Sequence, residues 1–434
     1  MLARPDPLRP PHLAARPPLP GGLCHSQNHS RTHDPHLRLR DAGRASFLLG
    51  SVERGRLGRN SWIGAGDRIA TLDKAAATGL PVVGYLGYDA VAALEPTVTL
   101  PADGHGFPDS RVVVADTLVR FDHGAGIAEV LAGDPDEIVG RLDGGVPWRR
   151  DRRGVAGPLR RHPGRERNED MVRRVKRHIA AGDVFQCVPS QRAERPTSAT
   201  PLDIYRTLRR VNPSPYLCLL ELDGIALIGS SPERLVAAKD GVASLCPIAG
   251  TTDASDGDAA RLLGSEKERA EHIMLVDLGR NDLSWVCLPG TVTVTRSLEV
   301  ERFSHVSHLV SEVVGSIRPG LSSLDVLGAC FPAGTVTGAP KVRAMQLISE
   351  LEGFRRGPCA GAVLYLLPDG TMDACIALRT IVVADGIAYL QAGAGVVAAS
   401  DPAAEHEECL RKLAALEMAI DRAEVEFALA GAGR

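Results

Sequence analysis

The sequence predicts an α+β fold. Between Val184 and Thr251, short apolar segments alternate with turn residues, which is typical of consecutive antiparallel strands. A longer segment, Ser265–Asp282, has helical spacing, and after it helical and strand-like segments alternate without a regular βαβ repeat. With 434 residues, of which 44% are hydrophobic, the chain can bury a large core as one domain or as two interleaved lobes.

Composition and charge argue against several classes of function. A net charge of −3 argues against a general polyanion binder, and an aromatic content of 4% leaves few stacking platforms for bases. The sequence has no apolar run long enough to span a membrane, and its start lacks the apolar segment of a secretory signal. The nine cysteines include no CxxC pair, so we expect reduced thiols in a cytoplasmic protein that binds neither nucleic acid nor a membrane.

Composition also predicts a division of the chain into regions. These are a disordered Pro/His/Arg-rich tail (1–44), an N-terminal region (45–143), a linker rich in Arg, Gly and Pro (144–167), a main domain (168–422) and a C-terminal tail (423–434). Two apolar runs between Ser46 and Gly64 flank a Gly/Arg turn and predict a hairpin. Asn168 is expected to cap the first helix of the main domain, which Gly182 ends.

The helix at Ser265–Asp282 places an acidic residue beside its apolar face. The predicted apolar stripe consists of Ala270, Ile273, Met274, Leu275 and Leu278. Glu271 lies at the border of this stripe, and Glu268, one turn earlier, adds like-charge repulsion. Two interpretations stay open: a solvated face on which Lys267 pairs with Glu271, or a Mg²⁺ site that needs a second carboxylate elsewhere.

A second pair of carboxylates occurs near the C-terminus. Asp401 as N-cap and Pro402 as first residue predict the start of a helix. Glu405 and Glu408 lie in its opening turns, where the positive end of the helix dipole favours carboxylates. Taken alone, this pattern is also ordinary for a helix whose apolar stripe is Cys409, Leu413, Leu416 and Ile420.

Two glycine-rich loops are predicted to suit a small carboxylate ligand. The first turns on Gly334 and Gly338 and enters a helix near Pro340, where backbone N–H groups face an anion, but it lacks the P-loop motif. The second contains Gly393 and Gly395 after a predicted strand. It matches G-x-G-x-x-A formally, yet no helix follows directly, which disfavours a dinucleotide fold.

Arg379 lies in an apolar segment that predicts a strand, where an unpaired guanidinium would be costly. It therefore predicts either an anionic ligand or an internal salt bridge. The sequence has neither a GxSxG motif nor a glutaminase-type cysteine in a glycine-rich elbow. If the chain uses nitrogen from glutamine, another chain must release it.

A series of motifs then occurs in a specific order: VFQCVPSQR, NPSPY, GSSPE, PIAGT, EKERAEHIMLVDLGRND, VERFSHVSHLVSEV, FPAGTVTGAPKVRAM, IALRT, QAGAGVVA and SDPAAEHEE. Together they resemble the signatures of the chorismate-utilising enzymes, and within that family the anthranilate synthase component I (large-subunit) group. The resemblance covers Ser46 to Ile420. It implies two large, mainly antiparallel β-sheets packed together with helices outside, and a chorismate-binding catalytic domain at 168–422.

The resemblance also implies roles for individual residues. Glu271 and Glu408 correspond to Mg²⁺ ligands, with the ion bridging to the ring carboxylate of chorismate. Glu233 corresponds to the acid that protonates the departing C4 hydroxyl, and His308 to the residue associated with the later elimination of pyruvate. The implied substrate-binding residues are Gly250, Thr251, Thr335, Cys359, Arg379, Gly393 and Gly395.

Two positions bear on the choice of nucleophile. Family members that add water have a lysine base where this chain has Gln186, and water must be deprotonated to attack. Members that aminate through an enzyme lysine have it where this chain has Ala249. The resemblance therefore implies addition of ammonia at C2 with loss of the 4-hydroxyl. The product, 2-amino-2-deoxyisochorismate, would lose pyruvate to give anthranilate, with ammonia from a glutamine amidotransferase partner.

Several positions depart from the family pattern. Cys359 replaces a substrate-binding tyrosine and Leu364 a glycine, which predicts a modified pocket. The possible tryptophan regulatory site keeps Ser51, Asn212, Pro213, Ser214, Pro215 and Tyr216. Gly50 stands where that site has a glutamate, so tryptophan inhibition is not expected.

These departures leave two other hypotheses. One is a 2-amino-2-deoxyisochorismate synthase of specialised metabolism that lacks the pyruvate-lyase step. The other is a non-catalytic ligand-binding subunit, which would be expected to lack a metal carboxylate or the acid. The sequence retains Glu233, Glu271 and Glu408.

Overall fold

The computed structural model describes residues 45–49, 61–64, 68–122, 127–138, 156–253, 257–302 and 306–429. The expected tail 1–44, the first half of the expected linker and Ser51 lie outside these ranges. Within them, no helix is long and apolar enough to cross a lipid bilayer.

The larger of two main sheets has ten strands, and each neighbouring pair is antiparallel. From one edge to the other its strands are β14 (Ile248–Asp253), β16 (Val306–Ser316), β13 (Val242–Leu245), β12 (Arg234–Lys239), β19 (Met372–Ile376), β18 (Ala362–Leu366), β3 (Val82–Leu86), β4 (Ser110–Val114) and β2 (Ser61–Gly64), with β15 (Thr293–Arg302) also paired to β16.

The second main sheet has six antiparallel strands: β10 (Tyr216–Leu222), β11 (Ile225–Ser231), β20 (Thr380–Ala384), β21 (Ile387–Gly393), β9 (Ser190–Pro196) and β7 (Arg160–His162). Two small sheets complete the β-structure. One contains β1 (Ala45–Leu49), β5 (Leu118–Asp122) and β6 (Ile127–Ala132), and the other pairs β8 (Gln186–Cys187) with β17 (Gly338–Ala339).

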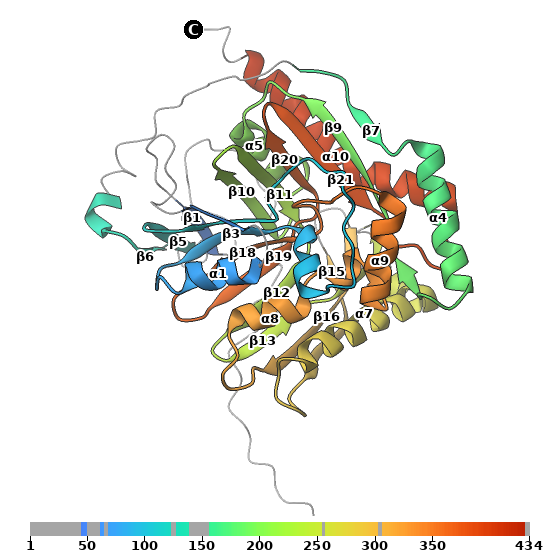
Figure 1. Ribbon diagram of the computed structural model, residues 1–434, viewed down its shortest axis with the longest axis horizontal. Coiled ribbons are helices and arrows are strands. Elements are labelled where there is room, and N and C mark those ends of the chain that lie inside the picture. The colour runs from blue at the N-terminus through green and yellow to red at the C-terminus, as the bar shows by residue number, and fades with distance from the viewer. Residues whose placement is uncertain are drawn as a thin grey trace, which may run out of the picture.

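Helices cover the outer faces of the two main sheets (Figure 1). On the ten-stranded sheet lie α1 (Arg68–Ala76), α7 (Glu266–Ser284), α8 (Ser323–Cys330) and α9 (Lys341–Glu352). On the six-stranded sheet lie α5 (Pro201–Val211) and α10 (Pro402–Leu429), and α4 (Arg165–Ala180) packs against α9 and α10. Further short helices are η1 (Tyr88–Ala90), α2 (Val91–Leu94), α6 (Asp258–Gly264) and η2 (Gly334–Val336).

The strand β3 illustrates why the sequence suits this layered arrangement. All five of its residues are buried. Val82 and Leu86 pack in the core under the helices, whereas Val83 and Tyr85 pack in the core between the two main sheets. Because successive side chains of a strand point to opposite faces, a strand covered on both faces must be continuously apolar. The predicted α+β fold with two packed antiparallel sheets is therefore confirmed.

The N-terminal region differs from its prediction. The expected hairpin between Ser46 and Gly64 is wrong, because β1 pairs with β5 and β2 pairs with β4. The strands β2, β3 and β4 also share one sheet with strands of the expected main domain. Each strand therefore pairs with a strand that is distant in the sequence, and an isolated two-stranded hairpin is at best marginally stable in water.

The predicted ends of two helices also need correction. Asn168 does not cap α4, which begins at Arg165 after Gly164, and the buried Asn168 side chain instead accepts a hydrogen bond from His406 Nδ1 at 3.1 Å. The helix α10 continues to Leu429, through the start of the tail expected at 423–434, and Ala423 is fully buried. Both helices are longer than their composition indicates because they pack against each other.

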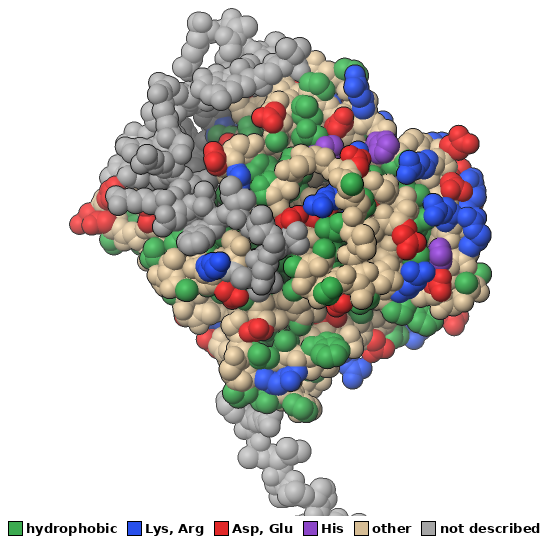
Figure 2. All heavy atoms as spheres, in the orientation of Figure 1, with side chains coloured by type: hydrophobic (Ala, Val, Ile, Leu, Met, Phe, Trp, Pro, Cys, Tyr) green, Lys and Arg blue, Asp and Glu red, His purple; other side chains and the backbone are tan. Residues whose placement is uncertain are grey.

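The surface in view carries no large patch of one charge. Figure 2 shows acidic and basic side chains interspersed over the flank that carries α4. There, Glu169 pairs with Arg165 at 2.8 Å and with Arg173 at 3.0 Å, each one helical turn away. Such exposed pairs contribute little to stability, because solvent and salt screen them.

Candidate functional site

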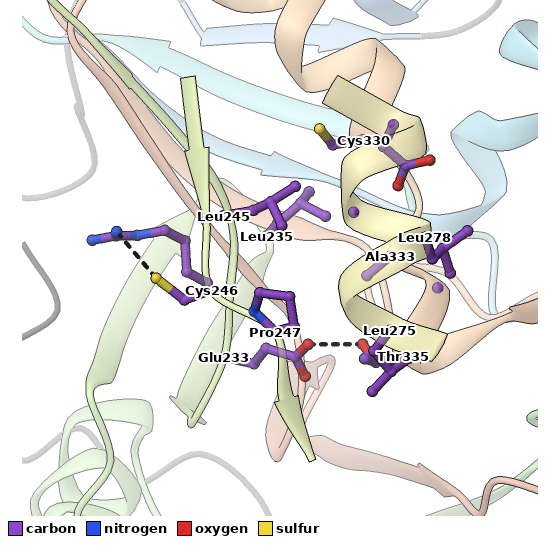
Figure 3. Close-up of a pocket in the computed structure, with 14 residues that line it drawn as sticks. Glu233, Leu235, Leu245, Cys246, Pro247, Leu275, Leu278, Cys330, Ala333 and Thr335 are labelled. Carbon is purple, nitrogen blue, oxygen red and sulfur yellow. Dashed lines mark hydrogen bonds between the residues drawn. The ribbon is translucent and has the colours of Figure 1, made fainter. Parts of the chain in front are cut away.

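Glu233 lies in the turn between β11 and β12, and its side chain is only 9% exposed. Thr335 in η2 donates a hydrogen bond to its carboxyl group at 2.9 Å, and Figure 3 shows the two side chains pointing toward one another. Burial raises the pKa of Glu233 to about 8, although Thr335 and the positive charges of Arg379 and Lys412 act in the opposite direction. At neutral pH, Glu233 is therefore a protonated acid.

A small cavity of about 40 Å³ lies beside Glu233, between β12, α7 and η2 (Figure 3). Leucine side chains line much of it, and it is large enough for ordered water but too small for a ring compound. Gly334 packs directly on α7, since a Cβ atom built on it would lie 1.8 Å from Leu278 Cδ2. Gly334 therefore serves close packing that places Thr335.

The loop before α9 is also packed against protein. A Cβ atom on Gly338 would lie 2.1 Å from the carbonyl oxygen of Gln186, because β17 and β8 run in close contact. At the start of α9, Lys341 forms an ion pair with Asp282 of α7 at 2.7 Å. Pro340 is the N-cap and not the first helical residue. The anion site expected at this helix start stays a prediction.

Arg379 does not lie in a strand, as its apolar neighbours predicted, but in the bend between β19 and β20. Its φ angle is +46°, and its carbonyl accepts a hydrogen bond from the Ser230 amide at 3.2 Å. Burial lowers the pKa of Arg379, while the charge of Glu233 opposes that change. No described residue forms a salt bridge or a hydrogen bond with the guanidinium, so the anionic ligand expected for Arg379 stays a prediction beside the internal salt bridge.

The two predicted metal carboxylates approach the glycine-rich loop after β21 from different helices. Glu271 of α7 accepts a hydrogen bond from Gln186 Nε2 at 3.3 Å, and that nitrogen lies 2.8 Å from a Cβ built on Gly395. Glu408 of α10 pairs with Lys412 at 2.7 Å. The described chain has no cluster of three or more His, Cys, Asp or Glu side chains arranged to hold a metal.

Lys412 is a residue that the sequence reasoning missed. Its ammonium group donates a hydrogen bond to the carbonyl of Gly393 at 2.8 Å and lies close enough to Glu233 to lower the pKa of that acid. The signal was available, because Lys412 follows Glu408 by one helical turn. Lys412 therefore brings a positive charge to the loop that contains Gly393 and Gly395.

His308 lies on β16, and its side chain is 9% exposed. Its Nδ1 atom lies 2.8 Å from the carbonyl oxygen of Gly250, which has a φ angle of +68°. Since a carbonyl only accepts, Nδ1 carries the hydrogen. Burial lowers the pKa of His308, so the ring is neutral at neutral pH and Nε2 carries a lone pair. Thr251 lies in β14, but its side chain is outside the described part of the structure.

The two departures from the family pattern lie in different places. The Cys359 thiol contacts the carbonyl of Gln391 at 3.8 Å, and burial raises its pKa to about 12. Leu364 instead packs in the core under the helices, opposite Gly84 of β3. The expectation that Leu364 modifies the pocket is therefore wrong, because its side chain points to the helix-covered face of the sheet.

The segment of the possible regulatory site ends at the start of β10. The Asn212 amide donates a hydrogen bond to Ser230 Oγ at 3.2 Å, and Pro213, Ser214 and Pro215 connect it to Tyr216. The Tyr216 hydroxyl accepts from Arg234 Nε at 2.7 Å. Ser51, the other expected member, lies outside the described residues.

The site therefore contains the neutral acid Glu233 within electrostatic range of the cations Arg379 and Lys412, and the neutral imidazole of His308 lies within range of Arg379. Residues 31–418 match the family of chorismate binding enzymes. The chain belongs to this family.

Individual relatives agree with this assignment. Anthranilate synthase component 1 of Thermus thermophilus is 40% identical, with 90% of this chain and 95% of that protein covered. The protein of the same name from Mycobacterium tuberculosis is 43% identical, over 84% of this chain and 78% of the relative.

Solved structures show the same likeness. The crystal structure of anthranilate synthase component I from Streptococcus pneumoniae matches with a TM-score of 0.76 and 34% identity, covering 89% of this chain and 95% of that one. A putative isochorismate synthase from Bacillus anthracis, at 21% identity and a TM-score of 0.65, shares the fold.

Proposed function

We propose that this chain is the chorismate-aminating component of an anthranilate synthase. The observation that carries the proposal is the buried Glu233, protonated at neutral pH and hydrogen-bonded to Thr335. It lies within the electrostatic range of Arg379 and Lys412, two cations that suit the carboxylates of chorismate. A neutral acid beside anion-binding groups can protonate a departing hydroxyl.

In this proposal, ammonia adds at C2 of chorismate while the 4-hydroxyl leaves as water with the proton of Glu233. Arg379 and the Gly393–Gly395 backbone hold the enolpyruvyl carboxylate. Thr335 orients Glu233, and Gly250, Thr251 and Cys359 line the ring. Gln186 has an amide that cannot deprotonate water, and Ala249 cannot form a covalent bond to the substrate, so ammonia is the nucleophile that these positions favour.

The carboxylate donors fit a hard divalent cation, and we propose Mg²⁺. Glu271 and Glu408 would each supply oxygen ligands. In the structure, Glu408 pairs with the cation of Lys412 at 2.7 Å. Mg²⁺ commonly completes its coordination shell with water and substrate oxygens, so one or two protein carboxylates suffice to hold it. When bound, the ion would neutralise the ring carboxylate of chorismate.

His308 supports a second step. A neutral imidazole whose Nδ1–H is held by Gly250 offers Nε2 as a base. It would accept the C2 proton of 2-amino-2-deoxyisochorismate as pyruvate leaves, which gives anthranilate. The 40% identical relative named anthranilate synthase component 1 favours this complete reaction over a synthase that stops at the intermediate.

We also propose the context of the reaction. The name "component 1" of the relatives supports a second component, and a glutamine amidotransferase subunit would supply the ammonia that this chain cannot release itself. The product would enter tryptophan biosynthesis in the cytoplasm. Asn212–Tyr216 with Ser51 would correspond to the possible tryptophan site, from which we expect no inhibition because Gly50 replaces the expected acid.

The test is an incubation of the purified chain with chorismate, Mg²⁺ and an ammonium salt at mildly alkaline pH. Anthranilate fluorescence, pyruvate and product mass are followed together. Fluorescence with equimolar pyruvate supports the complete reaction. An aminated product that keeps its enolpyruvyl group would replace it by the intermediate synthase, and no consumption of chorismate, even with an amidotransferase added, would refute both.

A further inference from the structure

A buried ion pair behind the candidate site joins Glu352, the last residue of α9, to Arg356 in the following loop. The exposed fractions of the two side chains are 1% and 3%, respectively. Arg356 Nε donates to Glu352 Oε2 at 3.1 Å and Nη2 donates to Oε1 at 2.5 Å, which makes a two-bonded fork. The pair is not needed to end α9, because Gly353 in the left-handed conformation ends it.

The guanidinium of Arg356 also bonds to two walls of the site. Nη1 donates to the carbonyl of Val336 at 2.9 Å, and Nη2 donates to the carbonyl of Val188 at 2.7 Å. Val336 directly follows Thr335, the partner of the acid, and Val188 lies two residues after Gln186. These carbonyls flank the β8–β17 ladder, so one planar group closes the end of that ladder.

Glu352 extends the same network to a third wall. Its Oε1 atom accepts hydrogen bonds from the amide and the hydroxyl of Ser190, both at 2.7 Å. The Ser190 hydroxyl in turn accepts from Gln391 Nε2 at 2.7 Å. Gln391 lies in β21 two residues before Gly393, so Glu352 connects the start of β9 to the strand that leads into the glycine-rich loop.

Asp89 and Tyr88 make further contacts that fix the orientation of Arg356. Its backbone amide donates to Asp89 Oδ1 at 3.2 Å, and the Gly357 amide donates to Oδ2 at 2.9 Å. The Tyr88 ring lies under the guanidinium, 4.6 Å from its carbon atom. The donor fork therefore has one orientation before any substrate arrives, which a flexible lysine ammonium could not reproduce.

We infer that Arg356, oriented by Glu352, is a positioning residue that fixes the wall carrying Thr335 relative to the wall carrying Gln186. It touches neither the acid nor the proposed metal carboxylates and acts through backbone carbonyls. The inference rests on the proposed function for its catalytic assay. A loss of alignment of about 1 Å at a reacting group lowers turnover by about 100-fold, so the network matters for rate even if the fold persists.

The test variant is Arg356→Lys, which keeps the charge and removes the fork. We expect kcat for chorismate consumption to fall about 10-fold to 100-fold, because Thr335 and with it Glu233 lose part of their alignment. The matched control is Arg355→Lys, one residue earlier, whose exposed side chain bonds only to the Pro101 carbonyl at 3.0 Å. We expect the control to keep kcat within about twofold.

A double-mutant cycle separates positioning from general stability. If Arg356 acts through the wall of Thr335, then Arg356→Lys in a Thr335→Val background lowers kcat by no more than about threefold, because the hydrogen bond to Glu233 is already absent. Multiplied losses, or an unchanged kcat in Arg356→Lys alone, would overturn the inference. Should Arg356→Lys fail to fold, Glu352→Asp replaces it in the same cycle.

The double-mutant cycle is also measured by binding: the Kd of chorismate is determined for each variant by titration calorimetry without ammonia. A wild-type chain that consumes no chorismate would refute the proposed function, but the coupling would still be measured from binding. Independent, multiplied changes in Kd would then overturn the positioning role, and coupled changes would support it.

Discussion

Lys412 and Glu408 form an ion pair of 2.7 Å across one turn of α10, and each side chain is 40% exposed. The pair places a cation next to a proposed metal ligand, while the same ammonium group bonds to the Gly393 carbonyl. An exposed pair of this kind contributes at most about 1 kcal/mol to stability. Its significance therefore lies in the position of the Lys412 ammonium group, which contacts Gly393 and lies within electrostatic range of Glu233.

Replacing Lys412 tests this cation. We expect Lys412→Met to raise KM for chorismate about 10-fold to 150-fold, because a hydrogen bond to a charged group contributes about 1.5–3 kcal/mol. The measurement is a steady-state assay at saturating ammonia. Arg411→Met, at the neighbouring exposed position of α10, is the control and should leave KM unchanged. Equal effects of the two changes would contradict a specific role for Lys412.

The acid Glu233 should set the alkaline limit of activity. Because its carboxyl must be protonated to act and its pKa is raised to about 8, kcat/KM should fall as the pH rises through about 8. Glu233→Gln should lower kcat about 100-fold to 10,000-fold and abolish that limb of the profile. A pH profile of both proteins checks this. Retention of the alkaline limb by Glu233→Gln would assign it to another group.

The same raised pKa predicts how stability depends on pH. Between pH 4.5, the ordinary pKa of the carboxyl, and about 8, the folded chain binds a proton that the unfolded chain has lost. The free energy of unfolding contributed by Glu233 therefore decreases as pH rises through this window. In urea unfolding at several pH values, the free energy of unfolding of Glu233→Gln should depend less on pH than that of the wild type. An identical slope in both proteins would argue against the raised pKa.

The proposed metal carboxylates can be tested against a neighbour on the same helix. Glu271→Gln and Glu408→Gln should each raise the Mg²⁺ concentration for half-maximal activity at least about tenfold, since even outer-shell partners of ligands have effects of this size. Glu417→Gln removes a carboxylate that pairs with Arg161 and is the control. Mg²⁺ titration after treatment with a chelator gives the measurement. Unchanged Mg²⁺ dependence in both variants would exclude these ligands.

The orientation of α7 gives a prediction on stability. Leu283→Ala should lower the free energy of unfolding by about 2–5 kcal/mol, because Leu283 is fully buried. Ile273→Ala should change it by less than about 1 kcal/mol, because Ile273 is 46% exposed. Urea denaturation of the two variants provides the comparison. A larger loss of stability in Ile273→Ala than in Leu283→Ala would mean that α7 buries the face with Ile273, as its sequence predicted.

Local signals in the sequence predicted several elements correctly. Ser265 caps α7 by accepting a hydrogen bond from the Glu268 amide, and Asp401 accepts one from the Ala404 amide at the start of α10. Each cap involves residues only three positions apart, so the local sequence is sufficient to predict where these helices begin. The alternating strands after Val184 are local in the same sense, since hairpins such as β10–β11 join neighbours.

The buried face of α7 could not be predicted in this way. Ile273 and Ala270 were expected inside, yet both are exposed, and fully buried His272 takes the inner position. The imidazole is accommodated by a hydrogen bond of 2.6 Å between its Nε2 atom and Ser311 Oγ on β16. A polar side chain with a distant partner can be buried, and hydrophobicity along one helix does not reveal that partner.

The candidate site shows the same limit. Motifs identified Glu233, Glu271, Glu408, His308 and Arg379, but Lys412 and Arg356 escaped notice. Their significance depends on carbonyl groups that are distant in sequence, such as Gly393 and Val188. A carbonyl oxygen is present in every residue, so no side-chain pattern marks the ones that will be used.

The pairing of β3 with β18 has a consequence for synthesis of the chain. Leu86 lies opposite Ala362. During translation, β3 therefore has no partner on this edge until most of the polypeptide has been synthesised. Until then, the apolar edge of β3 and β4 is open to chaperones and to other nascent chains. Translation that stops before β18 would release a fragment prone to aggregate, and shortening the chain from its C-terminal side would therefore harm the very strands that are made first.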